Sequence, residues 1–215
     1  MFKFHYSYRR QLIDRELSKL SISGRVLDLG GKKINKRGEF KPNAGSDWTY
    51  MNINPAEGAD VIANGEEIPA KDNSFDWVLC VEVLEFVQNP DRFIFEISRV
   101  LKSKGKLLLT APFLYRVHGK PNDLQRFTDQ KLKKLTSQKF EIKTLNAQGY
   151  FFTVLADFLK SAVAQVRRVW LRYLLALFIL PFVLLFRFLD EMDWICRSDF
   201  FTSFTTGYVL FAEKR

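Results

Sequence analysis

The sequence contains few cysteines, and this scarcity argues against two kinds of site. Cys80 and Cys196 are the only two among 215 residues, and they lie far apart without a CxxC pair. A disulfide framework or a cysteine-ligated zinc site needs more cysteines at closer spacing. We therefore expect no disulfide and no metal, and the composition favours a reducing compartment.

The N-terminal stretch lacks the pattern of a signal peptide. Residues 1–10 mix basic and aromatic side chains and contain no apolar run of the length that export requires. With 47% hydrophobic residues, a chain of this length is long enough for one sizeable core and short for two. The sequence predicts a single domain over residues 1–215 and a cytoplasmic location.

Acidic residues are lacking between positions 158 and 189. This strongly apolar stretch carries five basic residues, in a chain of formal net charge +9: Lys160, Arg167, Arg168, Arg172 and Arg187. An apolar segment with basic residues favours contact with an anionic membrane surface. A cluster of lysines between residues 131 and 143 makes nucleic acid an alternative partner to the membrane surface. A lysine-rich helix is more often a solvated face, and no nucleic-acid module is recognisable, so we expect no nucleic-acid partner.

The most informative stretch that is present covers residues 25–33, RVLDLGGKK. Its apolar residues suit a central parallel strand, and Asp28 can point past the end of that strand. Gly30 and Gly31 let the backbone turn tightly and approach a ligand closely. The stretch predicts a buried strand that leads into a nucleotide-binding turn.

Further blocks follow in a fixed order. Residues 72–85 read DNSFDWVLCVEVLE, residues 89–105 read NPDRFIFEISRVLKSKG, and residues 106–112 read KLLLTAP. Together with the glycine turn, these blocks resemble the class I S-adenosylmethionine-dependent methyltransferases. The similar branch acts on small molecules and has the consensus VLDxGxG, LPFxDxSFDxVxxxxVLEH and ExxRVLKPGGxLxxxxP. The resemblance covers residues 24–150 and a final strand.

Strands that alternate with helical patterns predict an α/β fold with a doubly wound, mostly parallel sheet. We expect strands at residues 25–29, 48–53, 59–63, 75–83, 107–110, 140–146 and 207–212, and helices at 8–20, 91–102 and 129–137. Thr128 is a plausible N-cap for the last of these helices. The resemblance implies a Rossmann-like sheet of seven strands whose last strand is antiparallel.

A helical insertion, residues 156–198, is expected before the last strand. Arg172 and Arg187 bound an uncharged run of 14 residues that contains Pro181. At about 1.5 Å per residue, this run is shorter than a hydrocarbon core of about 30 Å, so a crossing is not expected. We expect a helical pair, 162–180 and 182–190, kinked at the proline and dipping into one leaflet at the inner face of the membrane. The alternative is a pair packed against the core or a dimer partner.

The resemblance implies S-adenosyl-L-methionine as the cofactor. Seven residues match positions that contact it in the family: Asp28, Gly30, Gly31, Asn54, Asn64, Val81 and Glu82. The first three would lie against its methionine and ribose parts, because ligands bind at the open end of such a sheet. Asn54 matches an acid that holds the ribose hydroxyls, and Asn64 matches an acid near the adenine amine.

Four positions depart from the family pattern: Lys32, Asn54, Asn64 and Phe86. Lysine replaces a glycine, the two asparagines replace acids, and phenylalanine replaces the histidine of the LEH motif. An asparagine still accepts a hydrogen bond, but it loses about 1 kcal/mol of charge-assisted strength at each site. The departures leave two outcomes open, namely weaker cofactor binding or a fold that no longer catalyses.

For the acceptor side, residues 118–128 carry the pattern HxxPxDxxRFT. This pattern resembles a methyltransferase subgroup linked to bacterial surface polysaccharide or lipid-linked sugar modification. We name His118, Asp123 and Arg126 as candidate catalytic residues, with His118 as the general base because an imidazole pKa near 6.5 suits that task. The alternative is that Asp123 pairs with Arg126 and the three residues only stabilise the loop.

Three hypotheses follow from these patterns. The first is a methyltransferase at the membrane surface, acting on a small-molecule or lipid-linked acceptor, for example a saccharide hydroxyl. The second is a scaffold that keeps the methyltransferase fold without catalysis and binds membrane or a partner protein. The third, a nicotinamide-dependent enzyme, is disfavoured because residues 30–35 do not supply GxGxxG.

Overall fold

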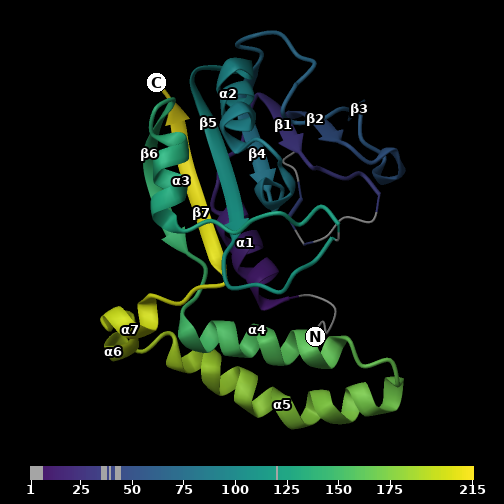
Figure 1. The fold of residues 1–215 in the computed structure, drawn as a ribbon, viewed down its shortest axis with the longest axis vertical. Coiled ribbons are helices and arrows are strands. Elements are labelled where there is room, and N and C mark those ends of the chain that lie inside the picture. The colour runs from purple at the N-terminus through teal and green to yellow at the C-terminus, as the bar shows by residue number, and fades with distance from the viewer. Residues whose placement is uncertain (1–6, 35–37, 39, 42–44, 120) are drawn as a thin grey trace.

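The computed structural model describes residues 7–34, 38, 40–41, 45–119 and 121–215. Its centre is one seven-stranded sheet in the order β3-β2-β1-β4-β5-β7-β6 (Figure 1). The strands are β1 (Arg25–Leu29), β2 (Asp47–Asn52), β3 (Val61–Ile62), β4 (Phe75–Val81), β5 (Leu101–Pro112), β6 (Phe140–Ala147) and β7 (Gly207–Lys214). The first five pair in parallel, and β7 runs antiparallel to both of its neighbours. The expected α/β fold is confirmed.

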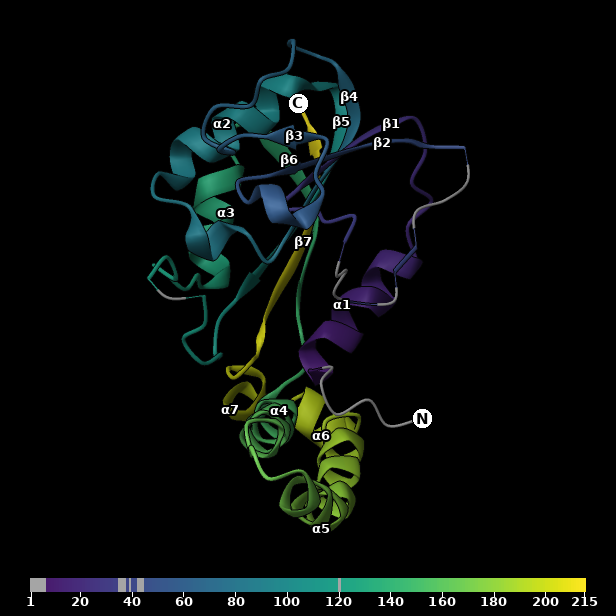
Figure 2. The ribbon, with the colours of Figure 1, turned by 90° about the vertical axis from the view of Figure 1, so that its right-hand side faces the viewer.

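Helices cover both faces of the sheet (Figure 2). On one face, α2 (Pro90–Val100) and α3 (Asp129–Thr136) bury apolar side chains with every second residue of the strands, including Leu27 and Leu29. On the other face, α1 (Tyr8–Ser18) packs on the alternate residues, such as Val26. Thr128 caps α3 as expected, because its hydroxyl accepts a hydrogen bond from the Lys131 N–H at 3.2 Å.

The strand order reverses its direction between β1 and β4, which are neighbours in the centre of the sheet. In open α/β sheets, ligands bind beyond the carboxyl ends of the strands at this switch point. Two 3₁₀ turns follow strands at this edge: η1 (Pro55–Glu57) comes after β2, and η2 (Leu84–Phe86) comes after β4. The topology therefore places the candidate site at the ends of β1, β2 and β4.

The helix expected at residues 91–102 ends earlier than predicted. The helix α2 stops at Val100, and Leu101 pairs with Phe75 as the first residue of β5. The register then shifts, so that Trp77 pairs with Lys106. A Cβ at Gly105 would lie 2.8 Å from the Lys102 carbonyl oxygen. The glycine therefore allows a tight bulge inside the strand and does not cap the helix.

The insertion between β6 and β7 comprises α4 (Phe151–Ala164), α5 (Val169–Leu189), α6 (Asp193–Cys196) and α7 (Asp199–Thr202). The predicted helices 162–180 and 182–190 are wrong in their boundaries. The first helix ends at Ala164 and the second begins at Val169, so Pro181 lies inside an uninterrupted α5. Residues on both sides of the proline pack against α4, and Pro181 itself is exposed. The packing therefore holds α5 together through a residue that usually ends or kinks a helix.

The two long helices form a layer beyond one end of the sheet. Figure 1 shows α4 and α5 side by side, with α5 farther from the sheet, and Figure 2 looks along them. Pro112, the last residue of β5, pairs with Gly207, the first of β7, which follows this insertion. The helical layer therefore lies at the same edge of the sheet as the carboxyl ends of the parallel strands.

Candidate active site

The turn after β1 accepts only glycine. Gly30 has a φ of +76°, and its N–H donates to the Met51 carbonyl at 2.8 Å. A Cβ at Gly30 would lie 2.3 Å from a methyl group of Val83, and a Cβ at Gly31 would lie 2.5 Å from the Asp28 carboxyl carbon. The predicted residues Asp28, Gly30 and Gly31 therefore form one tight turn between the ends of β2 and β4.

Asn52 supports this turn, and the sequence analysis missed it. As the last residue of β2, it donates from Nδ2 to the carbonyl oxygens of Gly30 at 3.0 Å and Gly31 at 3.1 Å. Its Oδ1 accepts from the N–H of Asn54 at 3.0 Å. Asn52 could have been identified from its position as the last residue of β2. The residue predicted for this position was Asn54, two residues further along the chain.

The two asparagines that were predicted to bind the cofactor cap local turns. Asn54 is exposed and accepts from the Ala56 N–H at 3.1 Å, which caps η1. Asn64 is also exposed and accepts from the Glu66 N–H at 3.1 Å. Lys32, which replaces a family glycine, turns to Glu57 of η1 with its Nζ 2.6 Å from the carboxylate. That ion pair accounts for the position of the lysine beside the glycine turn.

A buried arginine holds Glu82 beyond the end of β4. Glu82 has a φ of 58° and accepts hydrogen bonds from the Arg9 guanidinium and, at 2.8 Å, from the Thr110 hydroxyl. Arg9 is only 2% exposed and also donates to the Thr206 carbonyl at 3.0 Å. Val81, the last residue of β4, lies half-buried beside this group. Sequence analysis predicted Val81 and Glu82 but gave no signal for Arg9, since an arginine on an amphipathic helix is normally a surface residue.

His118, Asp123 and Arg126 are brought together in the loop between β5 and α3. Asp123 Oδ2 accepts the His118 backbone N–H at 2.7 Å and lies 3.2 Å from His118 Nδ1. Arg126 binds both carboxylate oxygens of Asp123, with Nη2 2.8 Å from Oδ2. The Arg126 hydrogen bond holds the pKa of Asp123 well below its usual range. The predicted pairing of Asp123 with Arg126 is confirmed, and the catalytic role of the three residues stays a prediction.

Two aromatic rings enclose the imidazole. Phe86 and Tyr115 both contact His118 edge-on, with ring centroids 5.4 and 5.2 Å away. Burial lowers the pKa of His118, in opposition to the charge of Asp123, while 18% of the side chain stays exposed. Phe86 occupies the position of the family's LEH histidine, and its ring packs directly on His118. An imidazole is therefore present beside this position, although it comes from a different part of the chain.

Glu85, in η2, is a third residue that was not predicted from the sequence, after Asn52 and Arg9. Its side chain is fully buried, and neither carboxyl oxygen accepts a hydrogen bond from a residue in the described ranges. The nearest imidazole nitrogen is His118 Nε2, 3.8 Å from Oε1. Burial, reinforced by the charge of Glu82, raises the pKa of Glu85 to about 8. The only signal in the sequence is its place in the VLE motif.

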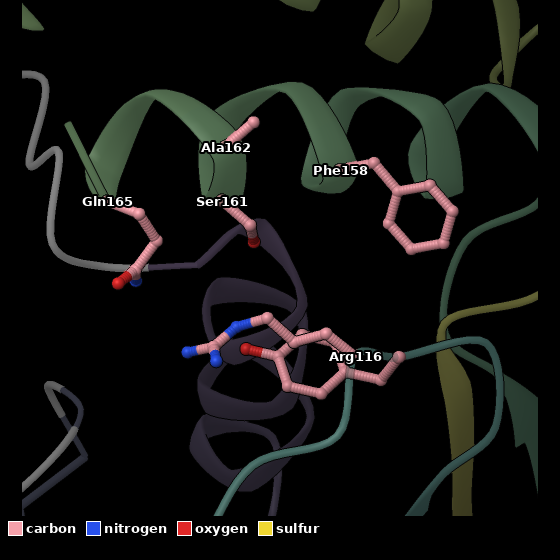
Figure 3. A pocket seen from close by; sticks show the side chains of 6 residues that line it. Arg116, Phe158, Ser161, Ala162 and Gln165 are labelled. Carbon is pink, nitrogen blue, oxygen red and sulfur yellow. The ribbon is translucent and has the colours of Figure 1, made fainter.

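A groove separates α4 from the loop that carries His118 (Figure 3). It has a volume of about 220 Å³ and is lined by Tyr115, Arg116, Phe158, Ser161, Ala162 and Gln165. Figure 3 shows the Phe158 ring on one side and the Arg116 guanidinium extending toward Ser161 and Gln165. Tyr115 connects the groove to the imidazole, because its ring also contacts His118, which is not among the lining residues.

Comparisons with known proteins agree with this architecture. Residues 15–109 match the family model described as a methyltransferase domain. Two uncharacterised proteins of Methanocaldococcus jannaschii, MJ1123 and MJ0638, are 49% and 51% identical to this chain over 49 residues. That segment is 23% of this chain and only 24% and 21% of those two relatives.

Several solved structures share the fold. The [4+2]-cyclase SpnF aligns with a TM-score of 0.57 at 18% identity over 99% of this chain and 85% of its own. A SAM-dependent methyltransferase from Methanosarcina mazei gives 0.52 at 16% identity, covering 93% and 96%. A Haemonchus contortus phosphoethanolamine N-methyltransferase, in complex with phosphomonomethylethanolamine and S-adenosylhomocysteine, gives 0.55 at 11% identity, covering 96% and 52%. The solved structures therefore show that this chain has the fold of the S-adenosylmethionine-dependent methyltransferases, and the methyltransferase family model matches less than half of the chain, at residues 15–109.

Proposed function

We propose that the protein transfers a methyl group from S-adenosylmethionine to an amphipathic acceptor at a membrane surface. The observation that carries this proposal is the groove between α4 and the His118 loop, which opens at the same edge of the sheet as the glycine turn. A substrate with an apolar part and a polar part suits a site that lies between an apolar helical layer and the ends of the strands.

The residues at the glycine turn fit the cofactor. The turn is so close to Asp28 and Val83 that no side chain is accommodated at Gly30 or Gly31, and the glycines bring the backbone and the Asp28 carboxylate together at the end of β1. We assign Asp28, Gly30 and Gly31, together with Glu82, to cofactor binding, with Asn52 holding the turn in place. Bound S-adenosylmethionine supplies an activated methyl group on a sulfonium ion. The protein then has to align the acceptor, exclude water and, for a hydroxyl acceptor, take up a proton.

His118 is the residue assigned to proton uptake. Burial lowers its pKa, so the imidazole is neutral near pH 7 and has a lone pair available. Asp123 fixes the ring through Nδ1, and Arg126 fixes Asp123, so the loop presents the imidazole in one orientation. Asp123 and Arg126 act through His118 and do not need to touch the acceptor.

The groove favours an acceptor with an anionic group. Phe158, Ala162 and the Tyr115 ring provide an apolar wall, and Arg116 is exposed at the other side of the groove. Within the described ranges, no carboxylate pairs with Arg116. A lipid-linked acceptor has a phosphate that suits this guanidinium and a hydrocarbon chain that suits the apolar wall. The Haemonchus contortus enzyme of similar fold was solved in complex with phosphomonomethylethanolamine, which is a precedent for an acceptor that bears a phosphate.

The exposed face of α5 supports the membrane part of the proposal. Trp170, Leu177 and Phe178 are 65%, 70% and 69% exposed, and Arg167 and Arg168 precede the helix. By length and composition α5 is able to cross a membrane, with a mean hydropathy of 2.3 and 17% of its most apolar stretch buried. However, α5 packs along α4, and α4 is attached to α1. The Asp157 carboxylate of α4 accepts a hydrogen bond from the backbone N–H of Tyr8 in α1, at 2.9 Å. We therefore propose that α5 lies flat on the cytoplasmic side, with its outer face among the lipids and its arginines at anionic headgroups.

The experiment that tests the enzymatic proposal is calorimetric titration of the full-length protein, in mild detergent, with S-adenosylmethionine and S-adenosylhomocysteine. We expect saturable binding that Asp28→Ala abolishes and that Asp91→Ala, at an exposed position in α2, leaves unchanged. Binding should be accompanied by transfer of labelled methyl groups into the organic-soluble fraction of a bacterial lipid extract. A folded protein that releases no heat at millimolar cofactor would contradict the proposal and favour a non-catalytic scaffold.

A further inference from the structure

Glu85 is a buried carboxyl group that lacks both solvent and a hydrogen-bond donor. It is fully buried in η2, and among the described residues no donor reaches Oε1 or Oε2. Its backbone carbonyl accepts the Leu124 N–H at 2.9 Å, which fixes η2 against the His118 loop. An ionised carboxylate in such a place carries a desolvation cost of several kcal/mol or more. The environment therefore favours the neutral acid.

The charged groups around Glu85 do not offset this cost. They are Arg9 from α1, Glu82 at the end of β4, and His118, Asp123 and Arg126 from the loop. The Arg9 guanidinium binds Glu82 and a backbone carbonyl, and Arg126 binds Asp123. Each arginine is therefore committed to another carboxylate. Burial and the charge of Glu82 together raise the pKa of Glu85 to about 8, against the weaker opposing effects of the residue's own backbone N–H and of the two arginines.

The imidazole of His118 lies between two carboxyl groups, with Nδ1 near Asp123 and Nε2 near Glu85. Nδ1 lies 3.2 Å from Asp123, which Arg126 keeps ionised, so Nδ1 is the nitrogen that carries the proton. Nε2 is then the acceptor, and it lies 3.8 Å from Glu85 Oε1. A neutral carboxylic acid has one O–H to donate, and an approach of about 1 Å brings the pair to hydrogen-bond distance.

We propose that Glu85 is a positioning residue, a neutral acid whose O–H donates a hydrogen bond to Nε2 of His118 and thereby fixes the imidazole as the tautomer protonated at Nδ1. Both ring nitrogens are then engaged. If the protein methylates a hydroxyl as proposed above, the acceptor O–H takes the place of the Glu85 O–H at Nε2, and Nε2 takes up the acceptor's proton while Glu85 keeps its own. The assignment of the tautomer itself does not depend on that reaction.

The test is ¹⁵N NMR of histidine in the full-length protein. The chain contains only two histidines, so His5→Asn assigns the resonances of His118. We expect Nδ1 to carry the proton near pH 7. We expect Nε2 to be hydrogen-bonded as an acceptor, and its resonance to shift with a midpoint near pH 8 as Glu85 ionises. Glu85→Gln keeps an N–H donor of similar shape, so it should retain the tautomer and remove this shift.

Glu85→Met separates positioning from packing. Methionine fills a similar volume without a donor, so the Nε2 resonance should move to that of an imidazole with a free lone pair, while the protein stays folded. The proposal is overturned if Nε2 carries the proton in the wild type near pH 7. It is also overturned if the shift near pH 8 persists in Glu85→Gln. Neither result involves methyl transfer, so a failure of cofactor binding would contradict the proposed function and leave this assignment standing.

Discussion

The carboxylate of Asp190, at the end of α5, accepts a hydrogen bond from the backbone N–H of Thr153 in the first turn of α4, at 2.7 Å. The same carboxylate accepts from the N–H groups of Tyr150 at 2.9 Å and Phe152 at 3.1 Å. The residue at the N-cap position of α4, Tyr150, provides no side-chain cap of its own. Asp190 therefore provides an acceptor for three N–H groups that lack one at the start of a helix. It also joins the C-terminal end of α5 to the N-terminal end of α4.

Asp190→Ala should destabilise the helical layer. Removal of the carboxylate leaves three buried or half-buried N–H groups without acceptors, and the loss of one helix cap costs about 1–2 kcal/mol. We expect a decrease of at least that size in the free energy of unfolding, measured by urea denaturation. Asp193→Ala, at an exposed position of α6, is the matched control and should change the free energy by less than about 0.5 kcal/mol. Equal effects of the two variants would show that Asp190 is not a cap.

Asp123→Asn should weaken the protein in a way that depends on pH. Its pKa is depressed in the folded state, mainly by Arg126, so its charge stabilises the fold above the unfolded pKa of about 4. That contribution is lost as the pH falls through the lower folded pKa. We expect a loss of about 2 kcal/mol near pH 6 and a smaller difference from wild type below about pH 4.

The matched control for this prediction is Asp129→Asn. Asp129 forms an exposed i,i+4 pair with Lys133, and such pairs contribute about 0.5 kcal/mol or less. Urea denaturation of the three proteins between pH 3 and pH 7 gives the comparison. A difference between wild type and Asp123→Asn that stays constant down to pH 3 would contradict the role of the ionised carboxylate.

Local patterns were sufficient for most of the fold. The strand and turn at residues 25–31 were predicted correctly, because an apolar run followed by two glycines has few alternatives in a compact chain. The Asp123–Arg126 pair was also foreseen, since residues three apart in one loop readily meet. By contrast, Arg9 and Glu82 are 73 positions apart, and no periodicity links them. Long-range polar pairs depend on the tertiary structure and have no local signal.

The helical insertion shows the same limit. Composition predicted apolar helices before the last strand, and this is confirmed. The position of the break was wrong, because Pro181 is the strongest local signal for a kink whereas α4 packs against α5 on both sides of it. Tertiary packing therefore outweighed a local preference.

Asn52→Ala should weaken cofactor binding more than Asn54→Ala does. Asn52 holds the carbonyl groups of Gly30 and Gly31, and the loss of its two hydrogen bonds loosens the turn assigned to the cofactor. At about 1 kcal/mol for each lost bond, we expect the dissociation constant for S-adenosylhomocysteine to rise about thirtyfold. Asn54 caps only the short η1 turn and should give a change of less than about threefold. Calorimetry measures both, and a larger effect at Asn54 would restore the original sequence-based assignment.

Replacing apolar side chains on the outer face of α5 should release the protein from lipid. Leu177 and Phe178 are about 70% exposed, and each contributes about 1.5 kcal/mol or more if it enters the bilayer. The double variant Leu177→Ser/Phe178→Ser should therefore bind vesicles of phosphatidylglycerol and phosphatidylcholine at least tenfold more weakly in a flotation assay. Ile62→Ser/Phe95→Ser, which changes two half-exposed apolar residues on the sheet domain, is the matched control and should float like wild type.

The arginines before α5 should determine the lipid preference. Arg167→Gln/Arg168→Gln removes two exposed charges, each worth about 1 kcal/mol near an anionic surface. Binding to vesicles that contain phosphatidylglycerol should fall about tenfold or more, whereas binding to pure phosphatidylcholine should stay the same. Lys131→Gln/Lys134→Gln removes the same charge from exposed positions of α3 and should leave both values unchanged. If the two charge variants weaken binding equally, the attraction depends on the net charge of the whole protein, and α5 has no specific orientation toward the membrane.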